Sequence, residues 1–318
     1  MSTIDIVNAA DASYVPHTAA MLHSLFTANP AETFAVHFLH NEDLEAGSLR
    51  QLGDLCARHH ARFSATAIPR ARLQGLPIAG RFPEQAWYRV FLPQVLPGVD
   101  RAIWLDSDAI VLAPIRELWA LDLEGLPLAA TPNAVLYSFA EVVRGIGVED
   151  RRRYFNSGVM LLNLGQMREE GSENTLRAAA MRHRRWIRFA DQDVLNAVYH
   201  TRYKRLPLAW NMVAHAHINV PETVRVHGHD EYREALAAPK IVHFTGVAAM
   251  KPWSYRCSHP HRDAYLRHRA EAGWPPPRYT DRSLRNALVR RLPMRLRAVL
   301  RTLWRGKYGE MLSYLREW

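Results

Sequence analysis

The stretch RAIWLDSDAIV, residues 101–111, decides how the rest of the sequence is interpreted. Apolar and β-branched residues lead into Asp106 and Asp108, which predicts a buried strand that ends in two carboxylates. Carboxylates at the edge of a core are costly unless a cation meets them. Side chains alternate along an extended segment, so Asp106 and Asp108 should point the same way, with Ser107 opposite, and reach one divalent metal ion.

An Asp-rich turn after a strand is the alternative explanation of this stretch, because Asp and Ser favour turns. The Asp-x-Asp pattern by itself is usually such a turn. Its position after a hydrophobic strand favours the metal site, since open α/β sheets bind ligands beyond the carboxyl ends of their strands.

The residues before this stretch alternate between strand and helix patterns. Alternating apolar residues predict strands at 3–8, 34–39 and 62–68, and helical spacing of apolar residues predicts helices at 14–27 and 43–60. The order of strand, helix, strand, helix and strand indicates a parallel, doubly wound nucleotide-binding sheet.

Further elements follow on both sides of the acids. We expect helices at 84–96, 118–123 and 165–186, strands at 126–131, 154–163 and 240–243, and a loop with a short helix at 133–153. A polar break at Asn156, Ser157 and Gly158 inside an apolar strand indicates either close approach of a ligand or a β-bulge.

Polar residues also mark two later positions. Asp191, Gln192 and Asp193 begin a helix, where one acid is expected to cap free N–H groups. His243 closes a short apolar strand, and Lys251 follows a loop of small residues. Together with the two acids at 106 and 108, His243 completes a ligand set that suits Mn²⁺ better than Ca²⁺, and Lys251 supplies a cation for a phosphate.

Composition sets the class of protein. A chain of 318 residues with 48% hydrophobic content can bury a sizeable core as one large domain or two smaller ones. Two cysteines exclude a disulfide framework and fit a reducing compartment. The N-terminus has no signal-peptide pattern, and no stretch approaches the roughly 18 uninterrupted apolar residues of a spanning helix. A cytoplasmic location is therefore expected.

The net charge of +10 is concentrated at the C-terminus. Residues 282–318 hold ten Arg or Lys residues and two Glu residues, which leaves +2 for residues 1–281. This division predicts a domain over 1–281 and a basic amphipathic helical tail over 282–318 that docks on an anionic membrane surface. A helical cap packed on the domain is the alternative for the tail. Nucleic acid is not an expected partner, because the basic charge is not spread over a face with aromatic platforms.

Five motifs in order resemble glycosyltransferase family 8, most closely its bacterial lipopolysaccharide α-galactosyltransferase and glucosyltransferase branch. The resemblance runs from about residue 3 to residue 257 and rests on NAAD (8–11), WLDSD (104–108), YFNSGV (154–159), DQDVLN (191–196), and HFTG (243–246) with KPW (251–253). It implies an α/β GT-A type Rossmann-like fold with a central, mostly parallel sheet. It also implies a UDP-sugar donor, Mn²⁺ with Mg²⁺ as the alternative, and transfer with retention of configuration.

The resemblance also assigns residues on the nucleotide side of the site. Asp106, Asp108 and His243 would bind the metal ion. The remaining nucleotide-side residues would be Ala9 beside the uracil, Asp11 on the uridine, Arg89 at the donor phosphate or sugar, and Gly246 and Lys251 on the diphosphate.

On the sugar and acceptor side, the resemblance implies Asn156, Asp191 and Gln192, with Asn133 at a position where an aspartate is common. Gln192 and Asp191 are the candidate catalytic residues. Because Gln192 matches the far face of the sugar, we expect departure and attack on one face within an ion pair, in preference to a covalent intermediate.

The expected function is transfer of glucose or galactose to a saccharide acceptor of lipopolysaccharide or another cell-surface glycan. A lipid-linked acceptor would place the enzyme on the inner face of the cytoplasmic membrane. Two other classes stay open at this point: a nucleotide-sugar-binding protein without turnover, and a basic membrane-binding or nucleic-acid-binding protein. The full set of metal and diphosphate residues argues against the first of these.

Overall fold

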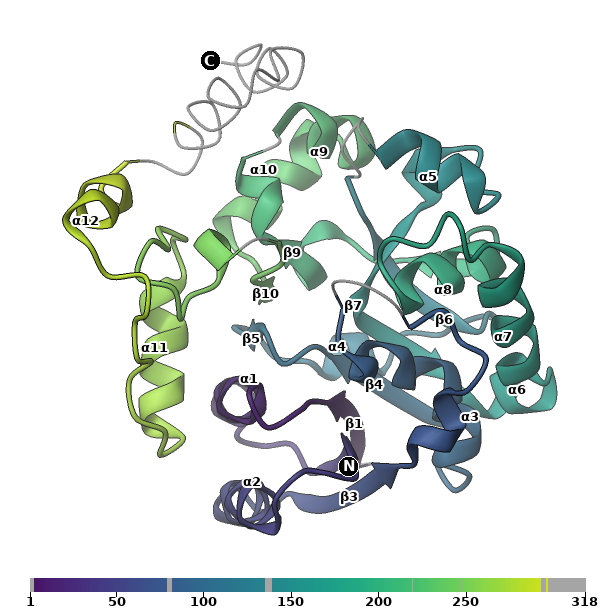
Figure 1. Cartoon of the computed structure of the whole chain (residues 1–318), viewed down its shortest axis with the longest axis horizontal. Helices are drawn as coiled ribbons and strands as arrows, with labels where there is room; N and C mark the ends of the chain where they lie inside the picture. Colours follow the sequence, from purple (N-terminus) through teal and green to yellow (C-terminus); the bar gives the residue numbers. More distant parts are fainter. Residues whose placement is uncertain are drawn as a thin grey trace.

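The computed structural model describes residues 3–78, 82–134, 139–218, 220–246, 248–292 and 296, which form an α/β fold around two sheets (Figure 1). The main sheet has seven strands in the order β3-β2-β1-β4-β7-β6-β8. In chain order these are β1 (Ile4–Ala9), β2 (Phe34–Asn41), β3 (Arg62–Ile68), β4 (Arg101–Leu105), β6 (Leu128–Pro132), β7 (Phe155–Asn163) and β8 (Tyr203–Arg205). A smaller sheet has the order β5-β10-β9, with β5 (Ala109–Val111), β9 (Met212–Val213) and β10 (Ile241–His243).

The first half of the main sheet is parallel, as the alternating strands and helices predicted. β1 pairs in parallel with β2 and β4, and β2 pairs in parallel with β3. β7 reverses the direction, because it runs antiparallel to both β4 and β6, while β6 and β8 are parallel. The sheet is thus mostly parallel. β7, which pairs with the strand that leads into the two acids, comes from a distant part of the sequence.

Helices cover both faces of the main sheet. The α-helices of the described chain are α1 (Val15–Ala28), α2 (Ala46–Arg58), α3 (Leu92–Val95), α4 (Arg116–Trp119), α5 (Ala140–Gly145), α6 (Leu164–Glu169), α7 (Ser172–Arg182), α8 (Asp191–Tyr199), α9 (Val220–His227), α10 (His229–Ala237), α11 (Arg262–Glu271) and α12 (Leu284–Arg290). Short 3₁₀ segments are η1 (Arg70–Leu73), η2 (Glu84–Phe91), η4 (Arg151–Arg153), η5 (Leu208–Asn211), η6 (Ala214–His217) and η7 (Ala248–Met250).

Three predicted helices differ from the structure in detail. The segment expected as one helix over 84–96 is η2 followed by α3, because Pro93 lacks the N–H that an unbroken α-helix would require there. The helix expected over 165–186 is α6 and α7, separated at Gly171, whose φ of +64° is a left-handed conformation that favours glycine. The helix expected over 118–123 begins and ends earlier, as α4.

A separate hydrophobic core lies on each face of the main sheet. On β4, Ile103 and Leu105 belong to the core that α1 and α2 cover, whereas Ala102 and Trp104 belong to the core that η2, α7 and α8 cover. A strand buried on both faces reads as a continuous apolar run, which explains the composition of residues 101–105. The polar residues that follow this run therefore lie at the edge of both cores.

The C-terminal part of the described chain returns to the beginning of the fold. α11 packs against α1, and Figure 1 shows it beside α1 at one side of the molecule, with α12 farther out. Leu284 and Leu288 of α12 are 88% and 67% exposed. Most of the tail expected over 282–318 lies outside the described residues, so the domain division at 281 stays a prediction. No described helix combines the length and the apolar character needed to cross a bilayer.

Candidate active site

The two acids of the central stretch lie on a turn, so the prediction that both continue an extended strand is wrong. β4 ends at Leu105, and the N–H of Ala109 donates to the carbonyl of Asp106 at 3.1 Å, which closes a tight turn. Ser107 points to the interior, where its hydroxyl lies 2.9 Å from that of Thr18. The turn brings the two carboxylates together as the expected strand would have done, because Asp106 and Asp108 still face one common point.

His243 joins these acids through the pairing of two short strands. β10 runs antiparallel to β5 with His243 opposite Ala109, and the N–H of Phe244 donates to the carbonyl of Asp108 at 2.8 Å. The Nε2 atom of His243 consequently lies 3.1 Å from Oδ1 of Asp108 and 3.5 Å from Oδ2 of Asp106. One candidate ligand atom from each of the three residues lies within 4.8 Å of the others.

Asn211 fixes the orientation of the His243 ring. Its Oδ1 lies 3.0 Å from Nδ1 of His243, at the junction of η5 and β9. Because an amide oxygen only accepts, Nδ1 donates to Asn211, and Nε2 is the ring nitrogen that faces the acids and would supply a lone pair to a bound ion. Asn211 was missed in the sequence, although a polar residue between the apolar Trp210 and Met212 is the same signal that marked Asn156.

Gly158 leaves the space in which the three candidate metal ligands meet. A Cβ atom at this position would lie 2.1 Å from Cε1 of His243 and 2.7 Å from Oδ2 of Asp106. The N–H of Asp106 also donates to the carbonyl of Gly158 at 2.8 Å, which ties the turn to β7. A β-bulge is present here too, since the register of β6 and β7 shifts between Ala130 and Thr131. The polar break in β7 is therefore a bulge at which the side chains of His243 and Asp106 lie close to the backbone, whereas the approach of a ligand stays a prediction. The residues present fit a bound cation.

Arg89 of η2 connects the turn to the start of α8. Its guanidinium donates to Asp191 at 2.8 Å and forms an ion pair with Asp106. The group also lies over the ring of Trp104, 4.2 Å from its centroid. Burial by itself would lower the pKa of Arg89, but the two carboxylates outweigh this effect and raise it.

Asp191 has an unusual acidity in this environment. Burial raises its pKa to about 6, and the positive charge of Arg89 opposes the rise without cancelling it. Asp193, two residues later, accepts hydrogen bonds from the N–H groups of Arg188 and Phe189 at 2.6 and 2.7 Å. Arg188 and Phe189 precede α8, and no side-chain cap is present at the start of this helix, so the expectation that one acid of the motif caps it is wrong. Asp193 instead holds the loop before the helix, whereas Asp191 faces the cluster.

Lys251 lies against the turn as a second cation. Its ammonium forms an ion pair with Asp108, and it lies 5.5 Å from the ring centroid of Trp253. Burial works against ionisation of Asp108, but Lys251 and His243 outweigh it and hold the pKa of this carboxyl well below its usual range. Asp108 is therefore anionic over the whole physiological pH range.

A chain of amides extends the cluster away from His243. Asn211 donates to Oδ1 of Asn156 at 2.8 Å, and Nδ2 of Asn156 donates to Oε1 of Gln192 at 3.0 Å. Nε2 of Gln192 then donates to the hydroxyl of Tyr154 at 2.9 Å, and this hydroxyl donates to Asp193 at 2.6 Å. Each amide is held in one orientation by its neighbours, so Asn156 and Gln192 present fixed polar groups.

The other residues implied by the resemblance lie at or just beyond the ends of β1, β6 and β10. Asp11 accepts from the N–H groups of Ser13 and Tyr14 at 2.9 and 3.1 Å and so shapes the turn that begins α1. The carbonyl of Ala9 accepts a hydrogen bond of 3.4 Å from Ser107. Asn133 is buried, and its Oδ1 has no hydrogen-bond partner among the residues that the structure describes. Gly246 follows β10 with a φ of +94°.

Asn8 is a second residue without a predicted role, and it supports the turn that carries Asp106 and Asp108. Asn8, buried at the end of β1, donates to the carbonyl of Leu105 and accepts from Thr18 at 3.1 Å. Its hydrogen bonds hold the carboxyl ends of β1 and β4 together.

Within the described chain, no hydrogen bond or ion pair joins Asp11, Asn133 or Gly246 directly to Asp106, Asp108 or His243.

Comparisons with known proteins agree on one family. The family described as "Glycosyl transferase family 8" matches residues 5–257. General stress protein A of Bacillus subtilis is 25% identical over 273 residues, 85% of this chain and 94% of its own length. Lipopolysaccharide 1,2-glucosyltransferase of Escherichia coli K12 is 23% identical over 255 residues, 79% of this chain and 72% of its own. The solved galactosyltransferase LgtC, with donor and acceptor sugar analogues, has a TM-score of 0.73 at 20% identity and covers 86% of this chain and 98% of its own.

Proposed function

Because the chain belongs to glycosyl transferase family 8 and has the GT-A fold, we propose that it transfers glucose or galactose from a UDP-sugar to a saccharide acceptor. The observation that carries this proposal is the meeting of Asp106, Asp108 and His243 beyond the carboxyl end of the central strand. A lipopolysaccharide or another cell-surface glycan is the proposed acceptor. The name of one relative, lipopolysaccharide 1,2-glucosyltransferase, supports this choice.

The three residues would hold a divalent ion, and we favour Mn²⁺ with Mg²⁺ as the alternative. Two carboxylates and one neutral imidazole suit Mn²⁺ better than Ca²⁺, which prefers oxygen ligands throughout. A bound ion would neutralise charge on the departing diphosphate. Asn211 keeps the lone pair of His243 directed at this place, and Gly158 keeps it free of side-chain atoms.

Lys251 supplies the second positive charge on the nucleotide side. In the structure its partner is Asp108, the same carboxylate that the ion requires. We propose that Lys251 pairs with the donor diphosphate when the donor is bound, with Gly246 giving the loop its left-handed turn. Ala9 and Asp11 would contact the uridine at the adjacent end of β1. This arrangement stabilises a leaving group by charge and requires no general acid there.

On the sugar side, fixed polar groups support retention through reaction on one face. The amide of Gln192 is held by Asn156, the Ser157 N–H and Tyr154, and an amide is a weak nucleophile. The carboxylate of Asp191 is engaged by Arg89. These groups are suited to binding and orienting the sugar, with Asn133 as a further contact. They favour departure and attack within one ion pair over a covalent glycosyl-enzyme.

A donor panel tests the transferase proposal. Release of UDP from UDP-glucose and UDP-galactose should occur with Mn²⁺, stop with excess chelator and return on adding Mn²⁺. Turnover that survives the chelator would contradict the metal assignment. Binding of UDP-sugar with no release from any donor would favour a nucleotide-sugar-binding protein without catalysis. A β-linked product would contradict retention, and a trapped glycosyl adduct on Asp191 would contradict the one-face reaction.

We also propose that residues 282–318 dock the enzyme on an anionic membrane surface at the cytoplasmic face, where a lipid-linked acceptor would be found. α12 supports this, because Leu284 and Leu288 lie one turn apart and are largely exposed. Asp281, three residues before α12, connects this helix to the rest of the fold, because its carboxylate accepts a hydrogen bond from the Ser254 hydroxyl at 2.7 Å. Nucleic acid is not a proposed partner.

Deleting residues 282–318 tests the docking proposal. The shortened protein should still release UDP with water-soluble acceptors but should no longer sediment with anionic vesicles. High salt should release the full-length protein, since each basic residue near an anionic surface contributes about 1 kcal/mol that salt screens. A deletion that unfolds the protein would favour the packed-cap alternative, and full-length protein that ignores vesicles at low salt would contradict docking.

A further inference from the structure

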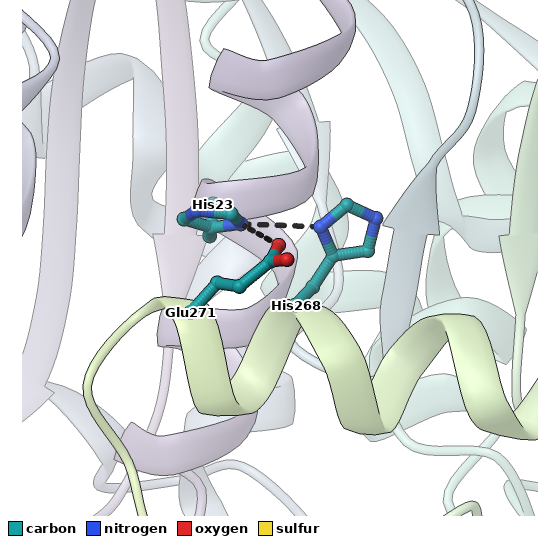
Figure 2. A group of neighbouring side chains, drawn as sticks. All are labelled: His23, His268 and Glu271. Carbon is teal, nitrogen blue, oxygen red and sulfur yellow. Dashed lines mark hydrogen bonds and ion pairs between the residues drawn. The ribbon is translucent and has the colours of Figure 1, made fainter.

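A second group of metal-ligating side chains lies between α1 and α11. Figure 2 shows His23 of α1 facing His268 and Glu271 of α11. The Nδ1 atoms of the two histidines are 3.1 Å apart, and Nδ1 of His23 lies 3.8 Å from Oε2 of Glu271. One ligand atom from each of the three residues lies within 4.8 Å of the others.

Helix geometry and packing bring these residues together. His268 and Glu271 are three residues apart on α11, so both point from the same face of the helix. That face packs on α1, where Tyr265 and His17 also form a hydrogen bond between their side chains. The sequence separation of 245 residues between His23 and His268 hides the group from any local pattern.

Both imidazoles are mostly buried, while the carboxylate opens to solvent. His23 and His268 are 9% and 7% exposed, and the side chain of Glu271 is 49% exposed. Burial lowers the pKa of His23, helped by His59, and it lowers the pKa of His268 to about 4. Neutral imidazoles with lone pairs are the form in which histidine binds metal ions.

We propose that His23, His268 and Glu271 bind one Zn²⁺ ion, separately from the active-site metal. Two imidazole nitrogens and one carboxylate oxygen form a known zinc ligand set, with a water in the fourth position. A tetrahedral Zn²⁺ with ligand bonds of about 2.0–2.1 Å holds its ligand atoms about 3.3 Å apart. The observed separations of 3.1 and 3.8 Å lie on either side of this value. The exposed side of Glu271 leaves room for the water.

The ion would join the first helix of the fold to the last helix before the tail. Other contacts also hold α11 in place. Near its start, Tyr265 bonds to His17 of α1, and just after its end, the carbonyl of Ala272 accepts a hydrogen bond from Arg58 of α2 at 3.2 Å. An ion that binds only the folded state stabilises it by mass action. Zn²⁺ should therefore raise the melting temperature of the full-length protein in a concentration-dependent manner.

Zinc binding by untagged full-length protein tests the proposal. To remove the active-site ligands from the measurement, the titration uses a background of Asp106→Asn and Asp108→Asn. One equivalent of Zn²⁺ should bind in this background. Loss of a hydrogen-bond partner of a metal ligand weakens metal binding about 10–100-fold. Loss of a ligand itself should cost at least as much, so Glu271→Gln and His268→Gln should each weaken Zn²⁺ binding at least about tenfold. His229→Gln, an exposed histidine on α10, is the matched control and should leave binding unchanged.

A fold check and a spectroscopic readout accompany the titration. Glu271 is half exposed, so Glu271→Gln should melt at the same temperature as the parent when no metal is added. Co²⁺ in place of Zn²⁺ should give the intense visible absorption of a tetrahedral site, which both variants lose. Absence of Zn²⁺ binding in the double-Asn background, or equal affinity in the parent and in Glu271→Gln and His268→Gln, would overturn the proposal.

Discussion

Among the residues that the structure describes, two clusters combine histidine with acidic side chains and differ in their charge. Asp106, Asp108 and His243 combine two acids with one imidazole at the ends of strands, while the cluster between α1 and α11 combines two imidazoles with one acid. The first cluster is paired with cations from Arg89 and Lys251. The presence of histidine and acidic residues therefore does not by itself define a site, because the balance of charge determines which ion and ligand a cluster suits.

The charge state of each cluster follows from its neighbours. Lys251 and His243 keep Asp108 anionic, so the strand-end cluster suits a hard cation shared with an anionic diphosphate. Burial keeps His268 neutral, so the interhelical cluster suits a borderline-soft ion that neutral nitrogen binds well. We expect catalysis at the first cluster and stabilisation at the second, and four predictions test this division.

The largest expected effect is that of Asp108→Asn. Loss of one proposed metal ligand should lower UDP release by about 10³-fold, since removing one electrostatic contact in a site costs about 10²–10³-fold. The measurement is UDP release with saturating Mn²⁺, alongside thermal unfolding. Asp108 lies at a strand end, so the folded structure should persist.

Glu271→Gln is the matched variant from the other cluster, and it should leave UDP release unchanged. Equal losses of turnover in Asp108→Asn and Glu271→Gln would show that the two clusters are not independent. Global unfolding of Asp108→Asn would instead make the acid a structural element of the turn.

The next effect concerns the space between the ligands. Gly158→Ala places a Cβ atom where His243 and Asp106 approach, so we expect about a hundredfold loss of turnover and a destabilisation of about 1–3 kcal/mol from overpacking. Gly98→Ala is the control, because its Cβ atom meets nothing within 4 Å. Turnover in Gly158→Ala equal to that in Gly98→Ala would mean that the strand-end cluster tolerates a displaced His243.

A smaller effect is expected from the residue behind His243. Asn211→Leu removes the acceptor for Nδ1, so the Mn²⁺ concentration for half-maximal activity should rise about 10–100-fold. Asn211→Asp keeps an acceptor at this place and should stay within a few-fold of the parent. A similar metal requirement in both variants would mean that the hydrogen bond does not orient the ring.

The smallest effect is a dependence on pH. With a pKa of about 6, Asp191 binds a proton as pH falls, loses its ion pair with Arg89, and should lower kcat/KM roughly tenfold by pH 5. Stability should move in the opposite direction. The pKa in the folded protein lies above the ordinary value of 3.8, so this group favours the folded state increasingly as pH falls from 6 towards 4.

Asp191→Asn tests whether the change in kcat/KM and the change in stability both come from this residue. The variant should lose both the acidic fall of kcat/KM near pH 6 and the relative gain in melting temperature between pH 6 and 4. An acidic limb that persists unchanged in Asp191→Asn would assign it to another group. The interhelical cluster should not affect the kcat/KM profile, and His268→Gln provides that control. It is not a control for the melting temperature, because the lowered pKa of His268 itself disfavours the folded state as pH falls from 6 towards 4.

Local sequence determined the elements of the fold and two of the three candidate metal ligands. Apolar periods of two and of about 3.6 residues predicted β1, α1, β2, α2 and β3 in order, because these periods report which face of one element is buried. Asp106 and Asp108 lie close together because one residue separates them, and they face one common point although the backbone forms a turn there and not the expected strand. The resemblance of five motifs to glycosyl transferase family 8 was confirmed by the family match.

Only the tertiary structure decided which distant residues share a site. His243 meets Asp108 across 135 residues because β10 and β5 pair in one register, and Gly158 approaches His243 and Asp106 because β7 pairs antiparallel with β4. The pairing of Arg89 with Asp106 and Asp191, and of His23 with His268, likewise depends on how η2, α8, α1 and α11 pack. A sequence pattern reports burial within one element, whereas strand register and helix packing are properties of the whole fold, and these set the distances between the groups that do the chemistry.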